Sequence, residues 1–161
     1  MIGQCIKCGN YNWDKEVDGN MVRCPKCGHT WEKVTFPLFI LTGCSGVGKT
    51  TTAQYIQQKK VDFVVLDADI FYSRLNPQTE EEQFAWVELI EQVSMNIMQS
   101  GRPVLWTMAG NLDKLHKVYC RRFFADVKCL ALTCEEDLLR KRMREGRGIT
   151  NEGWIQSSVD Y

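Results

Sequence analysis

The sequence predicts an α/β fold, in which helices cover both faces of a parallel sheet, preceded by a small metal-binding unit. From residue 36 onward, apolar segments of strand length alternate with segments of helical periodicity, as in a three-layer sandwich. Residues 1–35 are instead polar and turn-rich, and they carry two pairs of cysteines. We therefore divide the chain near residues 34–37, into units of residues 1–35 and 36–161.

Each predicted element follows from a local pattern. Thr79 and Glu82 form a capping box at the start of a long helix, and Gly101 followed by Pro103 ends it. Each expected strand is too apolar to have a face in water, which indicates a sheet covered on both sides. The expected strands are residues 36–42, 61–66, 104–108 and 127–133, and the expected helices are residues 49–60, 79–100, 112–124 and 135–144.

The composition limits the classes of partner. The 161 residues include 20 basic and 20 acidic side chains, so no net charge favours nucleic acid or an anionic membrane. No segment approaches the roughly 20 apolar residues of a membrane span, and the N-terminus lacks the apolar core of a signal peptide. We expect a cytoplasmic protein with no membrane partner, and we disfavour nucleic acid.

A phosphate-binding loop is the most specific motif of the chain. Residues 43–50 match G-x-x-x-x-G-K-[ST] at every fixed position, after a strand and at the start of a helix. In such loops backbone N–H groups surround the phosphates, the lysine neutralises β and γ oxygens, and the hydroxyl residue binds Mg²⁺. We expect ATP and Mg²⁺ to bind here, with nucleotide contacts from Gly43, Cys44, Ser45, Gly46, Val47, Gly48, Lys49, Thr50 and Thr51.

Two acidic residues follow the second predicted strand. The chain lacks the Asn-Lys-x-Asp string of a GTPase and the apolar strand ending in Asp-Glu of a motor ATPase. Instead, Asp67 and Asp69 stand where they could face the phosphates, Asp67 as a magnesium ligand with Thr50 and Asp69 as acceptor of a substrate proton. The alternative for both is a helix cap or an exposed turn.

A basic segment near the C-terminus is a candidate lid. Arg142, Arg144 and Arg147 lie on a predicted helix and the glycine-containing loop after it. Such cations could close on a phosphoryl group, and we place Arg142 and Arg144 with Lys49 and Asp69 among the catalytic residues. The alternative is a solvated helical face whose charges match the helix dipole.

From residue 36 onward the chain resembles small P-loop kinases of the nucleoside and nucleotide kinase type, akin to gluconate and shikimate kinases and often labelled AAA-family ATPases. The resemblance implies a nucleotide-kinase-like P-loop NTPase fold and phosphoryl transfer from ATP to a small acceptor. It places Asp69 at the acceptor, and Arg142, Arg144 and Arg147 on the lid. The segments that carry it are residues 41–51, 64–69, 100–104, 121–124 and 129–138.

Two departures from that family matter. Relatives continue into a helix and a fifth strand beside the first, and this strand is apparently absent here. We therefore expect either an exposed sheet edge, through which the protein could form a homo-oligomer, or a reduced activity. The N-terminal unit is the second departure.

The paired cysteines predict a zinc ribbon. Cys5, Cys8, Cys24 and Cys27 form two Cys-x-x-Cys pairs fifteen residues apart, which suits a structural zinc with four thiolate ligands. Residues 17–21 contain an Asp-Gly turn and predict a hairpin between the pairs. Iron, a disulfide pair or a ligand exchange with His29 are the alternatives.

The remaining candidates have ordinary interpretations. Trp13 and Trp31 could stack on bases, but we expect them to cover the metal core. The other four cysteines are interpreted as small hydrophobic residues in or near the core, and these are Cys44, Cys120, Cys129 and Cys134.

Three functional hypotheses remain open at this point: a kinase, a nucleotide-dependent switch whose ribbon binds a macromolecule, and a degenerate kinase. Turnover that depends on an acceptor separates the first from the other two. The sequence does not name the acceptor.

Overall fold

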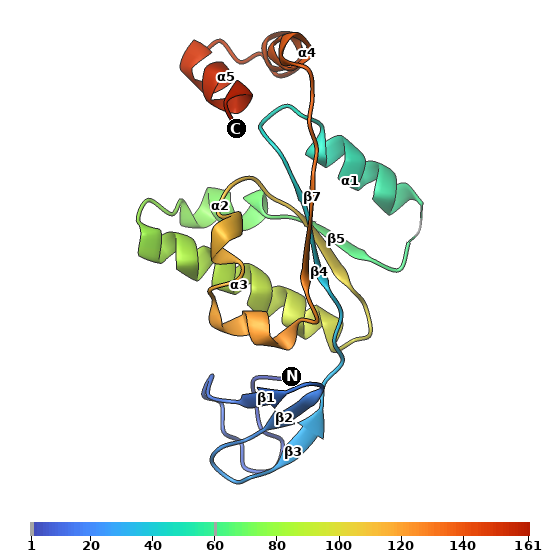
Figure 1. Ribbon diagram of the computed structural model, residues 1–161, viewed down its shortest axis with the longest axis vertical. Helices are drawn as coiled ribbons and strands as arrows, with labels where there is room; N and C mark the ends of the chain where they lie inside the picture. Colours follow the sequence, from blue (N-terminus) through green and yellow to red (C-terminus); the bar gives the residue numbers. More distant parts are fainter. Residues whose placement is uncertain (1, 60) are drawn as a thin grey trace.

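Two sheets organise the chain in the computed structural model, which describes residues 2–59 and 61–161 (Figure 1). Met1 of the predicted ribbon and Lys60 at the end of a predicted helix lie outside these residues. In the described part of the chain, no helix is long and apolar enough to cross a membrane.

The larger sheet has four parallel strands in the order β5-β6-β4-β7, which confirms the predicted fold class. Helix α1 (Lys49–Gln58) contacts β5 and β6 from one side, while α2 (Asp69–Leu75) and α3 (Glu80–Met98) lie across the other (Figure 1). The carboxyl ends of the strands therefore open toward one end of the molecule. The strands are β4 (Leu38–Thr42), β5 (Val64–Asp67), β6 (Val104–Thr107) and β7 (Val127–Ala131).

Helix α3 supplies much of the core. The predicted capping box is present, because Thr79 Oγ1 accepts a hydrogen bond from Glu82 N and the Glu82 carboxylate accepts one from Thr79 N. Trp86 and Ile90 are buried from this helix against Trp106 of β6. The Trp106 indole donates to Ser94 Oγ at 2.7 Å, so a buried polar pair is satisfied at the helix–sheet contact.

The structure differs from the sequence prediction at three places. Residues 112–124 do not form one helix but two 3₁₀ turns, η1 (Leu112–Lys114) and η2 (Tyr119–Phe123), because Val118 is extended between them. Helix α2 was not among the predicted helices. Strand β7 has a wet face, since only Val127 of its residues is buried and Leu130 is 65% exposed.

Among the described residues, strand β7 is one edge of the sheet and β5 is the other. The fifth strand was expected beside the first strand, β4, but β4 is already paired with β6 and β7 on its two sides. A further strand could therefore pair with β7 or with β5, the two outer strands, but not with β4. A homo-oligomer formed through such an edge stays a prediction.

The N-terminal unit is a three-stranded antiparallel sheet. β1 (Glu16–Asp18) and β2 (Met21–Arg23) form the predicted hairpin, and β3 (Thr30–Glu32) pairs with β2. Ile2 and Val22 belong to the same buried cluster as the residues of the larger sheet, so the ribbon shares a core with it. The boundary between the units stays an interpretation.

Residues 136–161, called here the C-terminal flap, follow β7. They comprise α4 (Glu136–Lys141), the π-turn η3 (Arg142–Gly146) and α5 (Glu152–Val159), beyond the carboxyl ends of the strands (Figure 1). The expected helix of residues 135–144 is thus shorter and ends in a π-turn. Leu139, Met143 and Ile155 form a buried cluster of their own.

Candidate functional site

A cavity of about 910 Å³ lies between the phosphate loop, the ends of β5 and β6, and the flap. Its size suits a nucleotide and its position at the carboxyl ends of parallel strands is where ligands of such sheets bind. The lining residues are Ser45, Gly46, Val47, Gly48, Lys49, Thr50, Thr51, Thr52, Asp67, Asp69, Thr107, Met108, Ala109, Arg142, Gly146, Arg147 and Trp154.

Two glycines of the loop are required by close contacts. A Cβ at Gly43, whose φ is +137°, would lie 2.6 Å from the Leu132 carbonyl oxygen. A Cβ at Gly46 would lie 2.9 Å from Met143 Cγ of the flap. The loop is therefore packed against the residue that follows β7 on one side and against the flap on the other.

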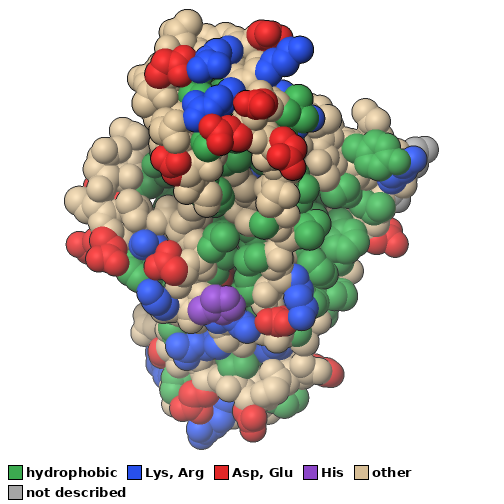
Figure 2. Space-filling view, turned by 45° about the horizontal axis from the view of Figure 1, so that its top comes forward, with side chains coloured by type: hydrophobic (Ala, Val, Ile, Leu, Met, Phe, Trp, Pro, Cys, Tyr) green, Lys and Arg blue, Asp and Glu red, His purple; other side chains and the backbone are tan. Residues whose placement is uncertain are grey.

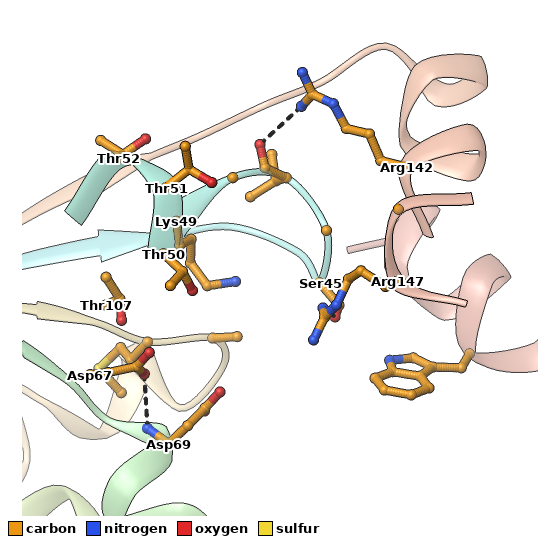
Figure 3. A pocket seen from close by; sticks show the side chains of 17 residues that line it. Ser45, Lys49, Thr50, Thr51, Thr52, Asp67, Asp69, Thr107, Arg142 and Arg147 are labelled. Carbon is orange, nitrogen blue, oxygen red and sulfur yellow. Dashed lines mark hydrogen bonds between the residues drawn. The ribbon is translucent and has the colours of Figure 1, made fainter. Parts of the chain in front are cut away.

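Lys49 points into the cavity from the first turn of α1 (Figure 3). Its Nζ donates hydrogen bonds to the carbonyl oxygens of Gly43 at 2.7 Å and Cys44 at 2.9 Å. Desolvation lowers the pKa of Lys49, whereas negative charge on Cys44 and Asp69 would raise it. The ammonium group occupies the centre of the loop, where phosphate oxygens would replace the two carbonyls as its partners.

The two predicted acids lie across the cavity from the loop (Figure 3). Asp67 is the last residue of β5 and Asp69 the first of α2, and the Asp69 backbone N–H donates to Asp67 Oδ1 at 3.1 Å. This bond turns the Asp67 carboxylate toward the start of α2. Asp69 is exposed to the cavity, and it does not cap α2, whose N-cap residue is Ala68.

The basic segment divides between the site and the solvent. Arg142 donates to the Val47 carbonyl at 3.2 Å and Arg147 donates to Ser45 Oγ, so both meet the loop (Figure 3). Arg144 lies elsewhere: it pairs with Glu152 of α5 through two hydrogen bonds, of 3.0 and 2.7 Å, and does not line the cavity. The structure therefore places Arg147, and not Arg144, beside Arg142.

Two aromatic residues at the site carried no prediction. Trp154 of α5 lines the cavity, with its ring centroid 6.0 Å from the Arg147 guanidinium carbon. The Tyr161 hydroxyl lies 3.1 Å from Thr42 Oγ1 and accepts a hydrogen bond from Gly110 N at 2.9 Å. Both reach the site through tertiary contacts of the flap, so no local signal could have found them.

The four cysteines of the ribbon form a second site, far from the cavity. The Sγ atoms of Cys5, Cys8, Cys24 and Cys27 lie within 4.8 Å of one another, which fits a tetrahedral ion with thiolate ligands. Each pair turns in the same way: Gly9 N donates to Cys5 O, and Gly28 N donates to Cys24 O, both at 2.8 Å.

Hydrogen bonds favour the thiolate form at Cys24, whereas at Cys8 the backbone N–H of Asn10 lowers the pKa but burial and contacts with the other three thiols raise it to about 11. Burial raises the pKa of Cys24, but N–H groups of Cys27 and Lys26 and the Asn10 side chain lower it to about 6. Asn10 Nδ2, 3.7 Å from Cys24 Sγ, is a supporting residue that the cysteine spacing could not reveal. Zinc chemistry therefore fits these residues, and His29 is not among them.

Comparison with known families places the larger unit. A family model described as AAA domain (AAA_18) matches residues 40–158, most of the chain and all of the cavity. The chain belongs to this family. The ribbon lies outside the matched segment of the AAA domain. No curated protein matches the sequence.

Solved structures share the fold of this AAA domain. A sugar kinase from Janibacter sp. HTCC2649 is 21% identical with a TM-score of 0.61, over 78% of this chain and 76% of that chain. A gluconokinase from Sinorhizobium meliloti 1021 is 19% identical with a TM-score of 0.52, over 80% and 75%. A chain of the Pnkp1/Rnl/Hen1 RNA repair complex is 22% identical with a TM-score of 0.58, over 78% of this chain but 44% of that chain.

Proposed function

We propose that the protein is a kinase that transfers the γ-phosphoryl group of ATP to a small acceptor, a nucleoside or a nucleotide-like molecule. One observation carries this proposal: a cavity-facing acid, Asp69, lies across from Lys49 of a complete phosphate loop. A loop that only binds nucleotide needs no such acid, whereas transfer to a hydroxyl requires an acceptor for its proton. The kinases of similar fold are consistent with it.

On the donor side, the loop holds the triphosphate. Its backbone N–H groups and Lys49 bind the β and γ oxygens, while Arg142 and Arg147 turn from the loop toward the transferring group. Thr50 and Asp67 would hold magnesium, which offsets the charge of the phosphates. Each of these groups stabilises charge that moves toward the leaving oxygen.

On the acceptor side, Asp69 binds the attacking hydroxyl and takes its proton. Its exposure to the cavity leaves both carboxylate oxygens free to reach a substrate, and its backbone is fixed by the bond to Asp67. The neighbouring Thr107, Met108 and Ala109 at the end of β6 form the floor beside it. The acceptor thus enters between α2 and the flap.

The test is ADP formation from ATP and Mg²⁺ with a panel of nucleosides, nucleotides and sugar acids. We expect one acceptor class to raise ADP release well above the rate with water alone, and mass spectrometry to find the phosphorylated acceptor. Lys49→Ala should abolish turnover with an unchanged circular dichroism spectrum. Asp69→Asn should lower kcat about 10² to 10⁴-fold and leave the affinity for ATP nearly unchanged.

The same assay separates the second candidate, a nucleotide-dependent switch. The exposed tip of the ribbon favours it, because Ile6 is 84% and Tyr11 66% exposed there, as at a protein contact. Tight ATP binding without turnover for any acceptor, together with an unchanged Asp69→Asn variant, would replace the kinase by this switch.

The ribbon and the location complete the proposal. We propose that the four cysteines bind a structural zinc ion, since four thiolates leave no open position for a substrate or water. Eight free cysteines suit a reducing compartment, which supports a cytoplasmic location.

A further inference from the structure

Two cysteines outside the ribbon, Cys44 and Cys134, lie near the close approach of the phosphate loop to the segment after β7. Strand β4 pairs with β7 so that Thr42 lies opposite Ala131, and Leu132 N donates to Thr42 O at 2.9 Å. Cys44 comes two residues after Thr42, and Cys134 three residues after Ala131, so both follow directly on the paired strand ends. The contact of Gly43 with the Leu132 carbonyl shows that the two backbones stay close there.

The side chains of this pair also share their surroundings. Cys44 and Cys134 both pack, half-buried, against Leu139, Met143 and Ile155 of the flap. Burial raises the pKa of Cys44, Lys49 lowers it, and negative charge on Cys134 raises it, so the charge of one thiol influences the other.

The Arg142 guanidinium group lies beside the Cys134 thiol. Arg142 Nη1 donates to Cys134 Sγ at 3.7 Å and to the Val47 carbonyl at 3.2 Å. This guanidinium group lies where it would stabilise negative charge on the Cys134 sulfur as that sulfur attacks an oxidant. Cys134 is therefore the attacking residue of the pair and Cys44 the resolving one.

We propose that Cys44 and Cys134 form a reversible disulfide that switches off nucleotide binding. The Cys134 thiolate attacks hydrogen peroxide, gives a sulfenic acid and releases hydroxide, which takes up the proton lost by the thiol to form water. The Cys44 thiol then displaces a second water and closes the S–S bond. Two thiols are oxidised, one peroxide is reduced to two waters, and a dithiol reductant reverses the reaction.

The bond acts directly on the loop. A disulfide fixes the two Cβ atoms about 3.8 Å apart, which ties the loop residue Cys44 to the start of the flap. The Cys44 carbonyl already accepts a hydrogen bond from Lys49 at 2.9 Å. The disulfide therefore holds the loop with Lys49 on its own backbone, and ATP must compete with this arrangement.

Other cysteines of the larger unit are poor alternatives. Burial, reinforced by Glu88, raises the pKa of the Cys120 thiol, which keeps it protonated and unreactive. Cys129 is exposed on β7, and burial of its sulfur raises its pKa as well. Cys129 thus provides a matched control, because it lies on β7 itself, five residues before Cys134.

The experiment oxidises the zinc-loaded protein with hydrogen peroxide and maps its tryptic peptides without reduction. Trypsin leaves Cys44 in residues 34–49 but Cys129 and Cys134 together in residues 129–140, so the Cys129→Ser variant makes the assignment unique. We expect a cross-link between these two peptides in the wild type and in Cys129→Ser, none in Cys134→Ser, and its loss after dithiothreitol.

Calorimetry with ATP then measures the effect. We expect oxidation to weaken ATP binding at least 10-fold in the wild type and Cys129→Ser, and to leave Cys134→Ser unchanged. A chromophoric chelator, applied to each sample, reports zinc lost from the ribbon, so that damage there is separated from the switch. Oxidised thiols without the cross-link, or equal loss of ATP binding in Cys134→Ser, would overturn the proposal. If the reduced protein binds no ATP, the phosphate-site assignment fails, while the cross-link still decides the disulfide.

Discussion

The ribbon and the C-terminal flap are two small units attached to opposite ends of one parallel sheet (Figure 1). The ribbon is built into the main core, to which it contributes Ile2 and Val22, and Lys33 donates to the Phe123 carbonyl at 3.2 Å. The flap keeps its own cluster around Met143. One unit is thus held by shared burial and the other by fewer, more local contacts.

The flap contacts that involve the rest of the molecule converge on the phosphate site. Arg142, Met143 and Arg147 meet the loop, and Tyr161 meets the strand end before it and the turn after β6. On the face shown in Figure 2, charged side chains also gather over the flap. Because the flap contacts the loop, a ligand bound in the loop changes the contacts that hold the flap. The ribbon, which packs in the main core, therefore anchors the structure, whereas the flap is placed to respond to a ligand.

Removal of the ribbon metal should have the largest effect. Without an ion, four thiolates repel one another and the three short strands have little core to keep them folded, so Ile2 and Val22 leave the shared cluster. We expect chelation, or Cys24→Ser, to lower the melting temperature by roughly 10 °C or more. Calorimetry checks the melting temperature, and metal analysis with colour distinguishes zinc from iron.

The matched control is Cys129→Ser, which changes an exposed thiol outside the ribbon. Its melting temperature should equal that of the wild type. A metal-free protein that melts at the same temperature as the loaded one would show that the ribbon does not depend on an ion, and the contrast between the two units would lose its basis.

The two arginines of the flap should differ in their effect on ATP binding. Arg147 contacts Ser45 of the loop, whereas Arg144 is paired with Glu152. We expect Arg147→Ala to weaken ATP binding about 10 to 100-fold, and Arg144→Ala by less than about threefold. Calorimetric titration of both variants with ATP measures this. Equal losses of ATP affinity in the two variants would mean that Arg144 also belongs to the nucleotide site, and they would contradict its exclusion from that site.

This pair also shows how far the sequence reaches. Glycine spacing, strand runs and a capping box are local signals, so the phosphate loop, the parallel sheet and α3 could be predicted. The π-turn at Arg142–Gly146 could not, since it depends on how the flap packs. Its wider turn changes which residues share a face of the helix. As a result Arg147 lines the cavity, and Arg144, which the sequence placed there, does not.

Other errors have similar causes. Helix α2 has seven residues and none of them is buried, so no apolar stripe marked it. Residues 112–124 carry apolar side chains, but tertiary packing breaks them into two short turns. Trp154 and Tyr161 come to the site from a distant segment, and only the folded chain shows that they belong to it.

A buried acid makes the stability of the main core, which holds the ribbon, depend on pH. Glu91 of α3 is fully buried, and neither oxygen has a hydrogen-bond partner among the described residues. Burial, with a further contribution from Glu88, raises its pKa from 4.5 to about 9. Between these values the unfolded chain loses a proton that the folded protein keeps, so the free energy of unfolding falls as pH rises, by at most about 1.4 kcal/mol per pH unit.

Glu91→Gln should remove this dependence. Because the amide does not ionise, we expect the variant to be more stable than the wild type by about 1 to 2 kcal/mol at pH 8 and no more stable near pH 4. Urea unfolding at pH 4, 6 and 8 measures both slopes. Glu80→Gln, at the exposed start of the same helix, should keep the wild-type slope, and parallel profiles for Glu91→Gln and the wild type would contradict the burial argument.

The smallest effect is expected from the hydrogen bonds of Tyr161, the last residue of the flap. The Tyr161 hydroxyl bridges Thr42 Oγ1, at the end of β4, and Gly110 N, in the turn after β6. Tyr161→Phe removes both hydrogen bonds and keeps the ring, so the core should not change. We expect faster hydrogen exchange in α5 and an ATP affinity about 3 to 10-fold lower, with the melting temperature within about 2 °C of the wild type.

Tyr55→Phe is the control for this substitution, because Tyr55 is 58% exposed on α1 and far from the flap in sequence. It should leave both exchange and affinity unchanged. A lower melting temperature without a change in α5 exchange would mean that Tyr161 supports the sheet and does not hold the flap. Faster hydrogen exchange in α5 with unchanged ATP affinity would instead show that the flap does not respond to the nucleotide. If the flap contacts do contribute to nucleotide binding, loosening them must also change the ATP affinity.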